Sequence, residues 1–222
     1  MYADNSLARF AINTNKLHWR ALNHLFNYIR TTRDQELVIN SNGRIEDMKI
    51  YADTNLGGEG WRLQHGYCGF LMGLLVKWNS KRQSCILAST CQAEYMALSF
   101  GERGGLWLLH NMEEVTGPIT PKILSDNQLA VKIVGNIGRR EKSRHIKREF
   151  HIINELVVNR KVNLEWVDTK HQLADIFTKS LRRIKIQPFI KAMGGLWGGV
   201  LKEVSRTLDI DNEYEIHKPH NL

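Results

Sequence analysis

The 222-residue chain has few cysteines and no long run of apolar residues. Its three cysteines are an odd number and form no C-x-x-C pair, which argues against a disulfide framework and against a zinc site. The longest apolar stretch, Tyr67 to Val76, is too short to span a bilayer. The N-terminus has no apolar segment of the kind that a secretory signal carries. We therefore expect an intracellular protein, cytoplasmic or nuclear, with no membrane partner.

The chain also lacks an excess of acidic residues. It has 31 lysines and arginines against 23 aspartates and glutamates, which gives a formal net charge of +8. A basic chain favours an acidic partner, and nucleic acid is the commonest one. Because 42% of the residues are hydrophobic and 24% are charged, a packed globular core is expected.

Hydrophobic periodicity predicts the order β-β-β-α-β-α-α-β-α after an N-terminal helical region. Three strands followed by alternating helices and strands indicate a mixed sheet with helices on its faces. A basic turn at 79–82 is expected to join the second and third strands, and residues 7–32 contain the N-terminal helical pattern. The predicted strands are 48–55, 66–78, 83–90, 121–127 and 162–168.

Acidic residues fall at the boundaries of these predicted elements. Asp53 ends the first strand and Asp126 the fourth, so they would lie side by side if those strands are neighbours. Glu94 is in the first turn of a long helix, and Asp175 is in the last predicted helix. Four converging carboxylates would bind hard divalent cations, Mg²⁺ first. Two such ions about 4 Å apart can activate water for phosphodiester hydrolysis.

Each carboxylate also has an ordinary structural interpretation. Asp126 precedes a predicted helix and could simply cap it. The other three could be caps or solvated surface charges. Because convergence depends on a predicted topology, the pattern alone leaves both interpretations open.

Five ordered motifs carry a family resemblance: YADTN, STCQAEYMAL, SDNQLAV, SRHIK and WVDTKHQLADIFTKSL. In this order and at these separations they resemble the ribonuclease H domain of copia-type retrotransposon polyproteins. The N-terminal stretch SLARFAINTNKLHWRALNHLFNYIRTT resembles the segment that links reverse transcriptase to ribonuclease H in that family. The resemblance implies a connection segment at 1–43, a ribonuclease H-like domain at 44–183 and a tail of no assigned role at 184–222.

The resemblance implies a ribonuclease H-like α/β fold, with a five-stranded mixed sheet flanked by helices. It implies cleavage of the RNA strand of RNA–DNA hybrids with two Mg²⁺ or Mn²⁺ ions. The family's catalytic, metal-binding acids match Asp53, Glu94, Asp126 and Asp175, the residues that the element boundaries also selected. His171, in the loop before Asp175, is a candidate accessory group for proton transfer.

Substrate contacts are expected from polar and basic residues. Asn127 and Gln128 could reach the minor groove of a hybrid, or could cap and solvate a helix start. A second candidate basic patch consists of Lys179, Arg182, Arg183 and Lys185. The main candidate phosphate-binding residues are Arg139, Arg140, Lys142, Arg144, Lys147 and Arg148.

These observations predict a metal-dependent ribonuclease H. The expected partners are an RNA–DNA hybrid and the remainder of a reverse transcriptase, with no small-molecule cofactor. The alternative is a catalytically inactive or domesticated remnant that still binds nucleic acid through its basic faces.

Overall fold

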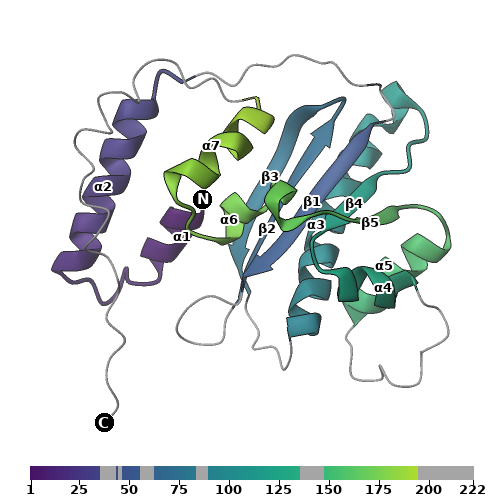
Figure 1. Cartoon of the computed structure of the whole chain (residues 1–222), viewed down its shortest axis with the longest axis horizontal. Helices are drawn as coiled ribbons and strands as arrows, with labels where there is room; N and C mark the ends of the chain where they lie inside the picture. Colours follow the sequence, from purple (N-terminus) through teal and green to yellow (C-terminus); the bar gives the residue numbers. More distant parts are fainter. Residues whose placement is uncertain (36–43, 45–46, 56–62, 84–89, 136–147, 195–222) are drawn as a thin grey trace, which may run out of the picture.

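The computed structural model of the chain describes residues 1–35, 44, 47–55, 63–83, 90–135 and 148–194 (Figure 1). None of the helices in these ranges is long and apolar enough to cross a membrane. From β1 to α6 the order of elements is the predicted one. The elements are α1 (Tyr2–Ala8), α2 (Lys16–Thr32), β1 (Met48–Asn55), β2 (Gln64–Leu71), β3 (Leu74–Arg82), α3 (Thr90–Thr116), β4 (Lys122–Ser125), α4 (Gln128–Gly135), α5 (Arg148–Val158), β5 (Asn163–Trp166), η2 (Thr169–His171), α6 (Asp175–Thr178) and α7 (Arg183–Ala192).

The strands form one five-stranded sheet in the order β3-β2-β1-β4-β5. β1, β2 and β3 form an antiparallel meander, whereas β4 pairs in parallel with β1 and β5 in parallel with β4. The predicted architecture, a five-stranded mixed sheet flanked by helices, is confirmed. The predicted adjacency of the first and fourth strands is confirmed as well, and this adjacency positions the functional site.

The hairpin between β2 and β3 lies elsewhere than predicted. The expected basic turn at 79–82 belongs to β3, and the expected strand at 66–78 is divided by a turn at Met72 and Gly73. These two residues have φ of 56° and 81°. Positive φ at both central residues is the geometry of a type I′ hairpin, whose twist matches that of the flanking strands. The predicted strand at 83–90 lies largely outside the described residues.

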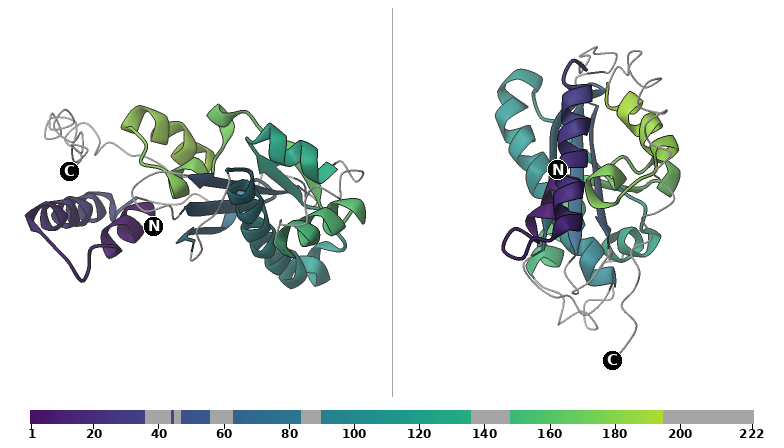
Figure 2. Two further views of the ribbon diagram at one scale, coloured as in Figure 1. Left: turned by 90° about the horizontal axis from the view of Figure 1, so that it is seen from below. Right: turned by 90° about the vertical axis from the view of Figure 1, so that its left-hand side faces the viewer.

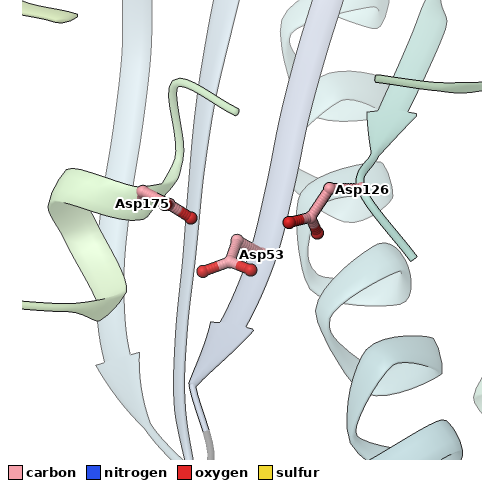
Figure 3. A group of neighbouring side chains, drawn as sticks. All are labelled: Asp53, Asp126 and Asp175. Atoms are coloured by element: carbon pink, nitrogen blue, oxygen red, sulfur yellow. The ribbon is translucent and has the colours of Figure 1, made fainter. Parts of the chain in front are cut away.

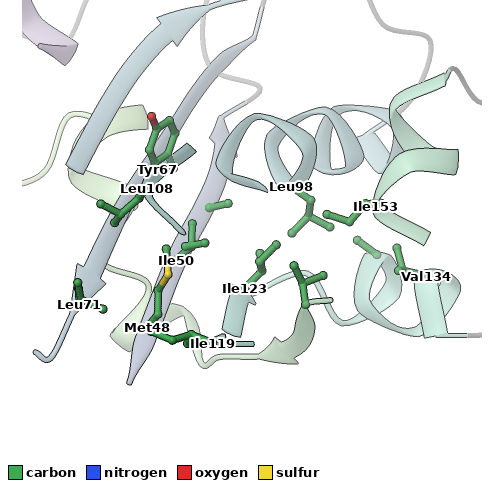
Figure 4. Packing of buried hydrophobic residues seen from close by; sticks show 13 residues of the cluster. Met48, Ile50, Tyr67, Leu71, Leu98, Leu108, Ile119, Ile123, Val134 and Ile153 are labelled. Atoms are coloured by element: carbon green, nitrogen blue, oxygen red, sulfur yellow. The ribbon is translucent and has the colours of Figure 1, made fainter. Parts of the chain in front are cut away.

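Helices cover both faces of the sheet (Figure 2). On one face, α3, α4 and α5 enclose the larger core, in which Ile50 and Ile123 of the sheet meet Leu98 of α3 (Figure 4). On the other face, Cys68 and Phe70 of β2 pack with buried residues of α6 and of the chain after α7. The buried side chains of that smaller cluster are Cys68, Phe70, Ala174, Phe177 and Met193. A sheet buried on both faces fits the apolar character of β2.

α3 lies close to β1 because it carries glycines where it crosses the strand. A Cβ on Gly101 would lie 2.9 Å from Cβ of Ala52, and a Cβ on Gly105 would overlap Ile50. The sequence predicts that glycine weakens the helix here, yet α3 is continuous from Thr90 to Thr116. The local cost of glycine is offset by contact between the helix and the sheet.

The N-terminal residues form two helices, of which α2 is the predicted one. Asn15 caps α2 by accepting hydrogen bonds from the backbone N–H groups of Leu17 and His18. α1 is joined to the sheet edge, because Nδ2 of Asn5 donates to the carbonyl of Ser80 at 2.8 Å. α7 lies within the predicted tail. The domain boundaries at 43 and 183 stay predictions.

Candidate metal centre

Three of the four predicted acidic residues come together at one edge of the sheet (Figure 3). Asp53 is on β1, Asp126 directly follows β4, and Asp175 begins α6. One carboxylate oxygen from each lies within 4.8 Å of the others. Asp53 is 1% exposed and Asp175 is 6% exposed, whereas Asp126 is half-buried.

The sheet register explains why Asp53 and Asp126 meet. β1 and β4 run parallel, with Tyr51 paired to Leu124. Asp53 and Asp126 each lie two residues beyond this pair, so they are opposite one another. Because side chains two residues apart lie on the same face of a sheet, both carboxylates lie on the face of Tyr51 and Leu124. Convergence of these two acids therefore follows from the strand pairing.

Asp175 is brought to this pair by the packing of α6 on the sheet. Gln172 is fully buried, and its Nε2 donates to the carbonyl of Ala52 at 3.0 Å. A Cβ on Gly66 would lie 2.6 Å from Cβ of Phe177 and 2.8 Å from Cγ2 of Thr178. The missing side chain at Gly66 thus lets α6 approach β2 closely enough for Asp175 to reach Asp53.

A lysine that the sequence analysis assigned to a surface patch lies inside the cluster. Nζ of Lys179 is 2.7 Å from Oδ1 of Asp175 and 3.3 Å from Oδ2 of Asp53. The hydroxyl of Thr178 donates to the same Asp53 oxygen. Asp175 and Lys179 are four residues apart, a spacing that suits an ion pair across one helical turn. The contact of Lys179 with Asp53 depends on the tertiary fold.

Asp126 has different partners. Oγ1 of Thr169 donates to Oδ2 of Asp126 at 2.9 Å, and Nε1 of Trp166 donates to its backbone carbonyl at 3.1 Å. The cap of α4 is Asn127, whose Oδ1 accepts from the backbone N–H of Ala130 at 2.9 Å. The interpretation of Asp126 as the helix cap is therefore wrong.

Burial controls the charge of the central carboxylate. It raises the pKa of Asp53 to about 7, with the carboxylates of Asp175 and Asp126 acting in the same direction and Lys179 and Thr178 opposing them. Burial lowers the pKa of Lys179, but Asp53 and Asp175 more than offset this, so its pKa lies above the usual value. Near neutral pH the cluster holds a charged lysine and an Asp53 that is close to its pKa, so a divalent cation beside Asp53 would favour release of its proton to solvent.

Other predicted site residues are not brought into the cluster by the described part of the chain. Glu94 is the fifth residue of α3, just after the first turn, but its side chain is outside the described residues, as is that of Arg148. His171 is exposed in η2, and Gln128 is exposed at the start of α4. Also outside the described residues are Arg139, Arg140, Lys142, Arg144 and Lys147.

The donor set fits a hard divalent cation. Carboxylate oxygens from three elements converge at distances that one ion can span, and such oxygens are the preferred ligands of Mg²⁺ and Mn²⁺. The ammonium of Lys179 already lies against two of these carboxylates, so a cation is favoured at this position. The geometry is thus compatible with a divalent-metal site.

Relatives of the chain are found among transposon proteins, although no family model matches it. It is 27% identical over 210 residues to the retrovirus-related Pol polyprotein from transposon RE2 of Arabidopsis thaliana, covering 90% of this chain and 14% of that protein. It is 28% identical over 196 residues to the Pol polyprotein from transposon TNT 1-94 of Nicotiana tabacum, covering 84% and 14%. The chain thus spans about one seventh of the length of these polyproteins.

A shorter match is to secreted RxLR effector protein 161 of Plasmopara viticola. It is 33% identical over 104 residues, which cover 46% of this chain and 72% of that protein. This alignment leaves more than half of the present chain unmatched, whereas the transposon alignments span nearly all of it.

Solved ribonuclease H structures are also similar to the chain. The N-terminal ribonuclease H domain of rv2228c from Mycobacterium tuberculosis is 17% identical, with a TM-score of 0.46 over 64% of this chain and 97% of that one. LC11-RNase H1 in complex with an RNA/DNA hybrid is 17% identical, with a TM-score of 0.47 over 60% and 94%. Over most of its length, the chain is thus similar to one segment of the retrovirus-related Pol polyproteins of plant transposons.

Proposed function

We propose that the chain is a metal-dependent ribonuclease H that cleaves the RNA strand of RNA–DNA hybrids. The observation that carries the proposal is the convergence of Asp53, Asp126 and Asp175 within 4.8 Å at one sheet edge. Similarity to the Pol polyproteins supports a nuclease role, because the chain matches a segment of proteins encoded by transposons.

The three aspartates would hold the metal, with Glu94 near the start of α3 as a proposed fourth ligand. When bound, two Mg²⁺ or Mn²⁺ ions would supply an activated water and neutralise charge on the scissile phosphate. Asp53 occupies the middle position, between Asp175 and Asp126 (Figure 3). Its carboxylate is therefore the one that can serve both sides of the cluster.

Neighbouring side chains hold the carboxylates in place. Thr178 donates to Asp53, and Thr169 donates to Asp126, so each carboxylate has one oxygen oriented by a hydroxyl. Lys179 adds a positive charge beside Asp53 and Asp175. This charge partly neutralises the two carboxylates while no metal is bound.

Hybrid binding is proposed for residues near Asp126 and for the basic run that follows α4. Gln128 is exposed beside the cluster, whereas the side-chain oxygen of Asn127 is engaged as a helix cap. The amide of Gln128 is therefore the freer of the two to contact a groove. Phosphate contacts are assigned to the basic residues of 139–148, in keeping with recognition of a hybrid through its backbone and shape.

A second proposed partner is the remainder of a reverse transcriptase. Trp19, Phe26 and Ile29 recur at helical spacing along α2 and are each more than half exposed. An apolar helical stripe of this size marks a contact surface. The polyprotein relatives are about seven times longer than the aligned segment, so they have further regions that could cover it.

The decisive experiment uses the full chain with a hybrid labelled on its RNA strand. We expect cleavage with Mg²⁺ or Mn²⁺, no cleavage in EDTA, and no cleavage of duplex RNA or DNA. Asp126→Asn should lower the rate at least about 100-fold, because it removes one negative ligand. Asp168→Asn is the matched control, since Asp168 only caps η2 and asparagine also caps well.

Cleavage that survives in Asp126→Asn at the rate of Asp168→Asn would contradict the proposed site. Hybrid binding with no cleavage under any divalent ion would contradict the proposed activity and favour a binding remnant.

A further inference from the structure

A second basic site lies apart from the carboxylate cluster. A pocket of about 430 Å³ opens between α3 and the strands β2 and β3. Four cationic side chains line it together with aromatic rings. The cations are Lys77, Lys81, Arg82 and Arg103, and the aromatic residues include Phe100 and Trp107. No carboxylate is present among the described residues that line the pocket.

The pocket and the carboxylates are on opposite faces of the sheet. His65 and Tyr67 of β2 lie against Phe100 of α3, with ring centroids 5.4 and 5.1 Å apart. Asp53, in contrast, contacts Thr178 and Lys179 at the end of α6. α3 and α6 cover different faces (Figure 2). A ligand in the pocket is therefore separate from one at the candidate metal centre.

Among the described residues, little negative charge offsets Lys81 and Arg103. In the part of the chain that the structure describes, none of its ion pairs involves Lys81 or Arg103. A carboxylate that acts on Arg103 is Glu102, but burial raises the pKa of Glu102 to about 7. His65 stays neutral near pH 7, because burial, with Arg103 and Lys81, lowers its pKa to about 4. An anionic ligand would relieve the repulsion among the gathered cations.

The aromatic residues indicate what kind of anion fits. Trp107 is 57% exposed, and Nζ of Lys77 lies 3.4 Å from its ring centroid. Phe100 forms part of the wall beside it. Cationic side chains interleaved with aromatic rings suit a strand of nucleic acid, since phosphates contact the cations and bases stack on the rings.

We propose that this pocket binds the sugar-phosphate backbone of a nucleic-acid strand, with a base against Trp107. The site goes beyond the proposed nuclease function, because it needs neither the metal nor the three aspartates. It would be a second nucleic-acid-binding site, on the sheet face opposite the candidate metal centre. An acidic protein surface is the competing class of partner, and the experiment separates the two.

The test measures binding of a fluorescent 12-nucleotide single strand in EDTA, with Asp126→Asn present in every protein. Lys81→Gln combined with Arg103→Gln removes two charges from the pocket. Arg160→Gln combined with Lys161→Gln is the control, because both residues are exposed and outside the pocket. We expect binding at least about tenfold weaker for the pocket variant at 50 mM salt, with a shallower salt dependence. Equal binding by the two double variants would overturn the proposal.

Trp107→Phe gives a second readout with the charges intact. Strand binding should quench tryptophan fluorescence in the chain that keeps Trp107 and much less in Trp107→Phe. Poly-glutamate and unlabelled strand are each tested as competitors of the labelled strand. If poly-glutamate competes as well as the unlabelled strand, the proposal is overturned in favour of an acidic protein partner. Competition by AMP at equal phosphate concentration would overturn the assignment to a strand. These experiments measure binding in EDTA and no cleavage. Their outcome therefore does not depend on whether the chain is a nuclease.

Discussion

Nζ of Lys179 lies 2.7 Å from Oδ1 of Asp175, inside the group of carboxylates that forms the candidate metal centre. The same ammonium is 3.3 Å from Asp53, which is almost fully buried. One lysine thus neutralises part of the charge that a divalent ion would otherwise neutralise. Stability of the metal-free chain and affinity for the metal are therefore linked through this residue.

Lys179→Met should destabilise the metal-free protein and strengthen its response to metal. Without the ammonium, two buried carboxylates lose their cation, and we expect a loss of about 2 to 4 kcal/mol at pH 8. Mg²⁺ should then restore more stability than it adds to the wild type, because it no longer competes with a resident cation. Thermal unfolding in EDTA and in 10 mM MgCl₂ measures both effects.

Lys191→Met is the control for this change, since Lys191 is exposed on α7 and in none of the described ion pairs. Equal Mg²⁺-dependent shifts in melting temperature for Lys179→Met, Lys191→Met and wild type would show that Lys179 does not compete with metal.

Thr169→Val should weaken the metal centre without unfolding the domain. The hydroxyl of Thr169 donates to Asp126 at 2.9 Å, and valine keeps the shape while removing the donor. Because Thr169 is exposed, the loss of unfolding free energy should stay below about 1 kcal/mol. We expect divalent-ion affinity to fall severalfold, as is typical when a group that orients a ligand is lost. Calorimetric titration with Mn²⁺ measures this affinity, and Thr31→Val on α2 is the control because it also removes a hydroxyl that bonds to backbone. Unchanged affinity in Thr169→Val would contradict the prediction.

The topology of the fold was predictable because its signals are local. The apolar pattern of each strand, the polar residues at its ends and the periodicity of each helix are all contained in short stretches of sequence. The order of these elements then leaves few possible topologies for a mixed sheet. The hairpin was mispredicted because its turn uses Met72 in a left-handed conformation, which nothing in the residue type announces. The basic residues 79–82 look like a turn but continue β3 along the edge of the sheet.

Sequence was enough to identify the acidic residues at the ends of strands, but not their contacts. Sequence could not decide whether Asp126 or Asn127 caps α4, since adjacent residues share the same propensity and only the backbone path separates them. It also missed the place of Lys179. The spacing from Asp175 was available as a helical pair, but the contact with Asp53 is created by the packing of α6 over β2.

Gly101→Ala should destabilise the domain despite the better helix propensity of alanine. The added Cβ would lie 2.9 Å from Cβ of Ala52, where neither atom can rotate away. Forcing α3 away from β1 should cost about 1 to 3 kcal/mol, more than the propensity gain of about 1 kcal/mol can offset. Urea unfolding followed by circular dichroism measures the loss. Ala52→Gly in the same chain should restore part of it by making room, and no recovery would contradict the contact.

Glu102→Gln should change stability in a way that depends on pH. Glu102 is 2% exposed, and burial raises its pKa from 4.5 to about 7. The folded state therefore holds this proton more tightly than the unfolded state, so the stabilisation is complete below pH 4.5 and is lost as pH rises through 7. Glutamine stays neutral at every pH. We expect Glu102→Gln to match wild type near pH 4.5 and to be more stable by about 1 to 3 kcal/mol at pH 8.

The quantity to measure is the difference in unfolding free energy between variant and wild type at pH 4.5, 6 and 8, because other titrating groups cancel in that difference. Glu113→Gln, on the same helix but exposed, should show no comparable trend. The difference for Glu102→Gln should grow between pH 4.5 and about 7, where the unfolded carboxyl is ionised and the folded one is not, and should level off above pH 7. A difference that is constant with pH would mean that Glu102 ionises in the folded chain as readily as in the unfolded one, and burial would then not control its charge.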